Sequence, residues 1–287
     1  MEIYYVNHKN EKIDFMSGCY SVESSSFFSH SWDYETQELQ KYGEKITRIK
    51  KGLKNHKMTL HIESQGLVSC DQAYNDLFDV FEADIFAEIP GKLYVEDSYI
   101  NCYVIKNSPR YFVPGIDVIS CELGFVMPRP FWISEQKIVI DPMIIGAISS
   151  EDDDLSTYPY TYPHKYPVLQ TETIAYIDHY KESDFQLTIH GPCTSVAINI
   201  ADYPYEVSYS LEKEEYMVID SRSFVEKERR LYVVRKNGNK ESIFNYRSVE
   251  NSVFKKIPSG TIRIDYPRAH GLELVIYKER SEPPWKS

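Results

Sequence analysis

The chain contains eight histidines and five cysteines, the residue types that most often bind metals or act as nucleophiles. Metal sites are recognised by short spacings such as H-x-H, H-E-x-x-H or paired C-x-x-C, and the sequence has none of them. His56 and His61 are the closest histidines, five positions apart, but in a strand they would point to opposite faces. The spacing therefore predicts no metal site and no cofactor.

Nucleophilic chemistry has no local signature either. Ser24, Ser25 and Ser26 precede His30, but they form a segment of small residues and not a nucleophile elbow. The cysteines are odd in number and far apart, which favours reduced and mostly buried thiols. No local pattern selects a pair of carboxylates for glycosidic cleavage. We therefore predict that the chain is not an enzyme.

Glycine spacing excludes further classes of enzyme. The chain has 12 glycines, and no two of them lie closer than nine positions. A phosphate-binding Walker loop needs two glycines five positions apart, and the dinucleotide fingerprint needs three within six positions. Neither motif fits this sequence, so the chemistry of nucleotide-dependent enzymes is not expected.

Net charge and apolar runs limit the possible partners. The formal net charge is −11, and binding to phosphate backbones or anionic membrane surfaces is driven by Lys and Arg. The most apolar stretch, residues 138–148, is interrupted by Asp141 and Pro142 and is shorter than a membrane span. The first residues do not resemble a secretory signal. We expect no nucleic acid and no membrane as partners.

One segment departs from the acidic average. Residues 41–57 contain seven basic residues and only one acidic residue, Glu44. A solvated hairpin explains this charge, and the alternative is a basic arm that contacts an acidic surface of a neighbouring copy. The candidate subunit-interface residues are Lys45, Arg48, Lys50, Lys51, Lys54 and Lys57.

Hydrophobic periodicity in the first half predicts strands and one main helix. Apolar residues alternate along 58–62 and along 119–127, as in half-buried strands. Ser69 and Gln72 have the spacing of a capping box, and an apolar stripe follows at helical spacing. The stripe consists of Tyr74, Leu77, Phe78 and Phe81. These elements indicate an α+β domain over residues 1–130, ending at a Pro-Arg-Pro sequence.

The second half, residues 131–287, is predicted to be a β-sandwich or jelly roll. Asn237-Gly238 predicts a hairpin with positive φ at both central residues, between strands 231–234 and 243–246. An acidic run and Tyr-Pro repeats near 149–168 indicate an exposed segment, and not a calcium loop. An alternative for the end of the chain is that the final strand and Trp285 pack back on the first domain.

Four segments together resemble the distal tail protein family of long-tailed phages that infect Gram-positive bacteria. The resemblance is carried by residues 22–26 followed by basic residues and 58–60, by 77–81 with 90–95, by 243–248 with 256–260, and by 277–285. They occur in the expected order and span nearly the whole chain. The last segment, Tyr-Lys-Glu-Arg-Ser-Glu-Pro-Pro-Trp, is the most distinctive.

The resemblance implies a structural hub of the phage tail tip or baseplate. In this family, N-terminal domains similar to tail-tube folds close into a hexameric ring, and a galectin-like β-sandwich projects outward. The implied partners are five further copies, the tail tube protein and a tail-associated lysin or fibre-type protein, with a receptor-binding protein in some members. The implied location is the virion tail, assembled in the cytoplasm of the host bacterium.

Two alternatives belong to other functional classes. One is a glycan-binding adsorption module whose C-terminal sandwich contacts the host cell wall, which a concave aromatic groove with a polar rim would favour. The sequence lacks the close spacing of His, Asn, Arg and Trp that marks galectin sugar sites, so a galectin-like shape alone does not imply sugar binding. The other alternative is a hydrolase that degrades the cell wall.

Overall fold

The computed structural model describes residues 1–283 except 40, 42, 67, 113–117, 143–171 and 226. It divides into two compact units, Met1–Ser134 with the chain from Glu279 onward, and Glu135–Lys278. The predicted border at 130/131 lies just before the chain leaves the first unit. Residues 279–283, which the sequence analysis assigns to the second domain, lie in the first unit. The Tyr-Pro segment lies outside the described residues.

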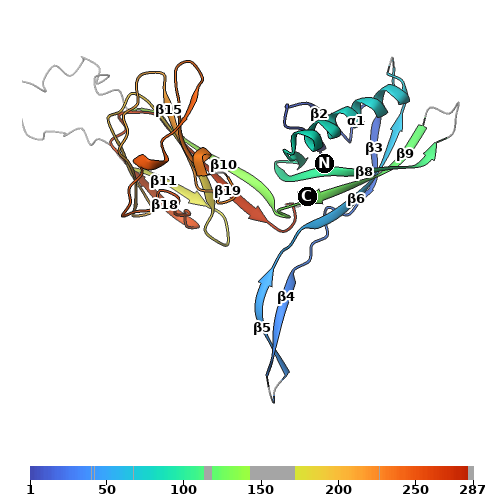
Figure 1. Ribbon diagram of the computed structural model, residues 1–287, viewed down its shortest axis with the longest axis horizontal. Coiled ribbons are helices and arrows are strands. Elements are labelled where there is room, and N and C mark those ends of the chain that lie inside the picture. The colour runs from blue at the N-terminus through green and yellow to red at the C-terminus, as the bar shows by residue number, and fades with distance from the viewer. Residues whose placement is uncertain are drawn as a thin grey trace, which may run out of the picture. The chain divides into compact units, whose positions relative to one another are not determined.

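The first unit combines antiparallel strands with one helix (Figure 1). Its elements are β1 (Ile3–Val6), β2 (Lys12–Asp14), β3 (Tyr20–Ser25), β4 (Asp33–Leu39), β5 (Gly43–Lys50), β6 (Lys54–Glu63), α1 (Cys70–Ala87), β7 (Gly91–Val95), β8 (Ser98–Phe112), β9 (Val118–Met127) and the start of β10 (Trp132–Ile140).

The long strand β8 belongs to two layers of strands in this unit. Its first part pairs with β7, which continues through β1 to β2. Its second part pairs with β9, which continues through β6 to β3. Two register shifts in the β8–β9 ladder, between 104 and 106 and between 109 and 111, bend the strand.

The predicted strands form the core of this unit. Met58, Leu60 and Ile62 on β6 are completely buried. They pair in register with alternate positions of β9, which buries the apolar residues predicted for 119–127. Period-two alternation therefore located both strands and the side of each that faces the core.

The helix α1 begins where the sequence predicts. Ser69 is its N-cap, and the Ser69 hydroxyl accepts a hydrogen bond of 3.2 Å from the backbone N–H of Gln72. The reciprocal half of the predicted capping box is not formed. The Gln72 side chain instead donates to Asp76 Oδ1 at 2.7 Å, one turn further along.

The predicted apolar stripe of α1 is wrong at one position. Leu77 and Phe81 are buried and Tyr74 is half-buried, but Phe78 is 42% exposed. The buried side of the helix is completed by Cys70, Ala73 and Val80, which come from positions that the stripe did not include. The helix is therefore rotated so that Phe78 faces outward.

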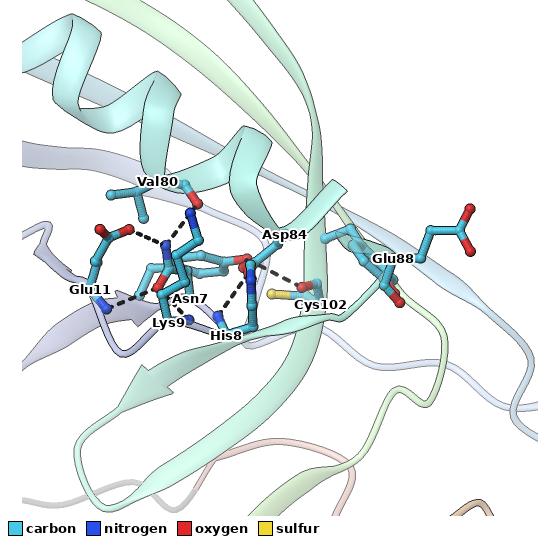
Figure 2. A network of polar contacts seen from close by, with 10 residues as sticks. Asn7, His8, Lys9, Glu11, Val80, Asp84, Glu88 and Cys102 are labelled. Atoms are coloured by element: carbon cyan, nitrogen blue, oxygen red, sulfur yellow. Dashed lines mark hydrogen bonds and ion pairs between the residues drawn. The ribbon is translucent and has the colours of Figure 1, made fainter. Parts of the chain in front are cut away.

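A buried carboxylate fixes this rotation. Asp84, in the last turn of α1, is completely buried, and its Oδ2 accepts a hydrogen bond of 2.6 Å from the Tyr5 hydroxyl. Its Oδ1 accepts a hydrogen bond of 2.8 Å from the backbone N–H of His8 and lies 2.6 Å from His8 Nδ1 (Figure 2). Burial raises the pKa of Tyr5, which keeps its hydroxyl protonated as a donor.

A second polar contact ties the same end of β1 to the helix. Asn7 accepts from the backbone N–H groups of Lys9 and Glu11 and donates to the Val80 carbonyl at 3.4 Å (Figure 2). The turn after β1 is thus held against α1 at two successive turns of the helix.

The second unit is a sandwich of two antiparallel sheets. The larger sheet has the order β17-β16-β15-β12-β19-β10, and the smaller has the order β11-β18-β13-β14. The elements that follow β10 are β11 (Glu172–Ile177), β12 (Asp184–His190), β13 (Val196–Ile200), β14 (Tyr203–Val207), β15 (Tyr216–Asp220), η1 (Lys227–Arg229), β16 (Leu231–Val234), β17 (Lys240–Ser242), η2 (Phe244–Tyr246), β18 (Gly260–Asp265) and β19 (Leu272–Arg280).

Both sheets contribute to one apolar core. Leu187 on β12 and Leu274 on β19 come from the larger sheet, and Ile198 and Ile264 come from the smaller. The protein is therefore mainly β, with an α+β first unit and a β-sandwich second unit, as the sequence predicts.

The hairpin at Asn237-Gly238 exists but differs from the prediction in two ways. Its turn is closed by the Gly238 N–H donating to the Arg235 carbonyl at 2.8 Å, and of the two predicted central residues only Gly238 has positive φ. Strand β17 ends at Ser242, because Ile243 is buried in the core and the chain then enters the turn η2.

The Asp84 network makes a stability prediction. A methyl group at Gly91 would overlap the Tyr5 hydroxyl and the Asp84 carboxylate, although the φ of this glycine suits any residue. Gly91→Ala should lower the free energy of unfolding by about 3 kcal/mol in urea titrations. Gly52→Ala, where the new methyl would make only an ordinary contact with Asp33, is the control and should change it little.

Candidate functional site

The strands β4 and β5 form a hairpin that carries half of the predicted interface residues. The ladder runs from Asp33 opposite Lys50 at its root to Leu39 opposite Gly43 near its tip. Every residue of both strands is exposed, and the hairpin projects away from the rest of the first unit (Figure 1). Because isolated two-stranded hairpins are only marginally stable in water, this element requires support.

One side of the hairpin is apolar near its root, and the acidic pair Glu38 and Glu44 lies further along the same side. Directly paired residues share a face of a ladder, which places Tyr34 and Ile49 on the same side, together with Ile46 opposite Thr36. Tyr34, Ile46 and Ile49 are 66%, 54% and 61% exposed. Contiguous exposed apolar side chains mark interaction surfaces, so we name these three residues the hairpin apolar face.

The opposite side of the hairpin is charged and largely balanced. Lys50 Nζ lies 2.5 Å from Glu35, and its hydrogen bond lowers the pKa of that carboxyl group. Lys54 Nζ lies 3.2 Å from Asp33 and lowers its pKa in the same way. Arg48 lies opposite Glu35 in the ladder. Residues 33–54 thus hold six basic and four acidic residues. Three of these acidic residues precede residue 41, so the charge of 41–57 alone overstates how basic the hairpin is.

The six predicted interface residues do not form one cluster. Lys45, Arg48 and Lys50 lie on β5, Lys51 lies at the root of the hairpin, and Lys54 and Lys57 lie on β6. Lys57 Nζ lies 3.0 Å from Glu122 of β9, a carboxylate that Lys106 also approaches at 3.5 Å. Their role in subunit contacts stays a prediction.

A cation–aromatic cluster holds the root of the hairpin. Lys51 Nζ lies 4.9 Å from the ring centroid of Phe131 and 5.6 Å from that of Trp32, and the two rings meet edge to face. Lys51 also donates to the Ser281 carbonyl at 3.3 Å. Burial lowers the pKa of Lys51. Both strands of the hairpin are therefore anchored to the body of the unit at this point.

The serine-rich segment does not form a catalytic pair with His30. Ser26 Oγ lies 3.2 Å from Nδ1 of His56, a partner that sequence reasoning did not identify because it comes from β6. The same Nδ1 lies 2.7 Å from the Ser26 carbonyl, to which it donates, so it is not available to accept the hydroxyl proton. The contact is structural.

In the described part of the chain, the cysteines and histidines show no reactive arrangement. All five cysteines are free. Burial raises the pKa values of Cys102 and Cys193, and that of Cys121 to about 12, which keeps these thiols protonated. In the described ranges, no three His, Cys, Asp or Glu side chains are placed to hold a metal ion. Nor does that part of the chain contain a helix long and apolar enough to cross a membrane.

The second unit has a groove of about 660 Å³ on its larger sheet, lined mostly by polar and charged residue types. Tyr232 of β16 lies in its lining, and Lys240 Nζ lies 5.4 Å from the centroid of that ring. The Arg222 guanidinium donates hydrogen bonds to the Asp220 carboxylate, from Nε at 3.0 Å and from an Nη atom at 2.7 Å. Gln186, Val225, Arg229 and Ser242 complete the lining. Aromatic and hydrogen-bonding groups thus share one hollow.

Comparisons with known proteins identify the fold. No protein-family model and no curated protein sequence matches the chain. Among solved structures, phage SPP1 Dit (gp 19.1), described as a paradigm of the hub adsorption apparatus of Gram-positive-infecting phages, matches with a TM-score of 0.58 at 9% identity. The match covers 97% of this chain and 98% of Dit.

Two structures of the phage P2 baseplate in its activated conformation also match. The one with calcium has a TM-score of 0.63 at 11% identity, and the one with strontium has 0.62 at 12%. Each match covers 98% of this chain and 99% of the other. The chain therefore has, from end to end, the fold of phage hub and baseplate proteins, as the sequence resemblance predicts.

The anchor at the root of the hairpin can be tested by hydrogen exchange. Lys51→Met keeps the length of the side chain but removes its charge, and should raise exchange of the amides in β4 and β5 about fivefold, equivalent to about 1 kcal/mol. Lys41→Met, at the tip, is the control and should leave exchange unchanged. Equal effects of the two variants would contradict a specific anchor.

Proposed function

We propose that the protein is a structural component of a phage tail tip or baseplate, in which copies of the first unit close into a ring that joins the tail tube to the adsorption apparatus. The observation that carries this proposal is the likeness to hub and baseplate proteins, which extends over nearly the full length of both chains. A likeness confined to one unit would support only a shared domain.

The hairpin supports the ring. The hairpin apolar face is exposed to solvent, and the charges on the other side of the hairpin are mostly balanced within the chain. Such a face is stabilised when it packs on another surface, which a neighbouring copy would provide. Six copies is the number that the family resemblance implies, and Lys45 and Arg48 remain predicted contact residues.

The same proposal specifies partners and location. A ring at the tail tip would contact the tail tube protein on one side, and a tail-associated lysin or fibre-type protein on the other. A receptor-binding protein is a further proposed partner. The protein would be assembled in the cytoplasm of the host bacterium and remain in the virion tail, and we propose no catalytic role.

The mass of the purified protein in solution tests the ring. Light scattering over a concentration series should detect an assembly of about six times 33.6 kDa, and negative-stain images should contain rings. A double variant, Ile46→Asp with Ile49→Asp, should be monomeric and keep its melting temperature, because both side chains are exposed.

A matched variant separates the two sides of the hairpin. Lys45→Glu with Arg48→Glu changes the charged side, and should weaken assembly less than the apolar variant does. A stronger effect of charge reversal would place the contact on the basic residues. A wild-type chain that stays monomeric, with and without tail tube protein, would contradict the ring.

The groove of the second unit favours glycan binding as a second candidate function. It combines the ring of Tyr232, on which a sugar could stack, with the polar groups of Gln186 and Lys240. A soluble module that contacts cell-wall carbohydrate would use such a surface. Its chemistry differs from that of a ring hub, and the two functions can coexist in one chain.

Cell-wall binding tests this second candidate. Tyr232→Ala should weaken the binding of purified cell-wall fragments at least about fivefold, because the stacking surface is lost. Tyr176→Ala is the matched control, since Tyr176 is exposed on β11 of the other sheet. Absence of binding by the wild-type chain would exclude the second candidate.

A further inference from the structure

The first unit contains a cavity of about 360 Å³ at the root of the hairpin. Hydrogen-bonding side chains gather in it, and apolar residues complete its lining. Among the described residues that line the cavity there is no aspartate or glutamate. All of the lining belongs to the first unit of one chain. The polar side chains include those of Lys51, Lys54, His30, His56, Asn55 and Ser31.

Lys51 brings a half-buried ammonium group to this cavity. Its Nζ donates to the Ser281 carbonyl at 3.3 Å and lies over two aromatic rings. A carbonyl and two ring faces compensate a positive charge less fully than a carboxylate does. Burial and the charge of Lys54 lower the pKa of Lys51, and the opposite effect of Glu282 does not cancel them. An anion in the cavity would supply the missing negative charge.

His56 lies in the same positive surroundings. Its Nδ1 donates to the Ser26 carbonyl at 2.7 Å, and within the described part of the chain its hydrogen bonds are made at Nδ1 and not at Nε2. Burial lowers the pKa of His56, and the charges of Lys51 and Lys54 lower it further. A neutral ring with its proton on Nδ1 has a lone pair on Nε2, which can accept a hydrogen bond from a protonated oxygen.

These groups together favour phosphate over a carboxylate as the anion. Inorganic phosphate keeps a proton on one oxygen near neutral pH and has further oxygens that accept hydrogen bonds, whereas an ionised carboxylate only accepts. Lysine ammonium groups suit the accepting oxygens, and Nε2 of His56 suits the protonated oxygen.

Two carboxylates lie close to the cavity, but each already has a partner. Asp33 lies 3.2 Å from Lys54 Nζ, and Glu282 lies 3.8 Å from His30 Nδ1. Neither belongs to the described lining. The net charge of −11 argues against broad binding of polyanions, but affinity in a recessed site depends on the groups within it.

We propose that this cavity is a binding site for a phosphate group. Lys51 and Lys54 would donate charge-assisted hydrogen bonds to its oxygens, and Nε2 of His56 would accept one from its protonated oxygen. The cavity has the volume of about a dozen water molecules, more than one phosphate ion fills. It therefore has room for inorganic phosphate or for a small phosphate monoester. The site is independent of the ring proposed above.

Calorimetric titration with inorganic phosphate tests the site, with the ionic strength held constant by chloride. The wild type should bind saturably at one site per chain. Lys51→Met should weaken binding at least about tenfold, because a hydrogen bond to a charged group is lost. Lys106→Met is the matched control and should bind like the wild type, since Lys106 lies outside the described lining, 3.5 Å from Glu122.

A second variant separates the site from the anchoring of the hairpin. Asp33→Asn with Lys54→Met removes the other ammonium group and leaves no unpaired carboxylate beside the cavity. This variant should also weaken phosphate binding, at least about fivefold. Hydrogen exchange in β6 and β9 should match that of the wild type in both variants, which would show that the sheet beside the cavity is intact.

Two further titrations identify the ligand. Tighter binding of glycerol 3-phosphate than of inorganic phosphate would identify a monoester, and weaker binding would identify the free ion. Acetate that binds as tightly as phosphate would overturn the assignment to phosphate. Absence of saturable phosphate binding by the wild type, or equal binding by the wild type and both cavity variants, would overturn the site.

Discussion

The buried carboxylate of Asp84 is the constraint on which the first unit depends. Taking a carboxylate out of water is costly unless donors surround it, and here the donors come from Tyr5 and His8 on the first strand and its turn. The contact locks the end of α1 onto the sheet and sets the rotation of the whole helix. Gly91 is required beside it, because any side chain would occupy the same space.

That rotation determines what the unit offers to other molecules. With one side of α1 committed to the core, Phe78 and Phe86 face solvent, and the hairpin likewise exposes Ile46 and Ile49. The unit buries its core but leaves apolar side chains exposed on two separate surfaces. Repeated head-to-tail contacts use two different surfaces of each copy. The first unit therefore exposes apolar side chains on both the helix and the hairpin.

The second unit differs from the first in how its apolar and charged side chains are used. Its two sheets bury a continuous core, and its groove is lined by charged groups that are partly paired, such as Arg222 with Asp220.

In the first unit, burial keeps the thiols of Cys102 and Cys121 protonated, and Nδ1 of His56 donates to the Ser26 carbonyl. Residues that suggested chemistry in isolation are therefore used for packing and anchoring.

The sequence by itself determined the features that depend on neighbours along the chain. Alternation located β6 and β9, the hydroxyl of Ser69 marked the start of α1, and Asn237-Gly238 marked a hairpin. The division into an α+β part and a sandwich followed from the same local patterns. Only the tertiary structure decided that Phe78 faces outward, that β4 supplies carboxylates to Lys50 and Lys54, and that Ser26 meets His56. Each of these depends on groups far apart in the sequence, such as Tyr5 and Asp84, whose contact fixes which side of an element is buried.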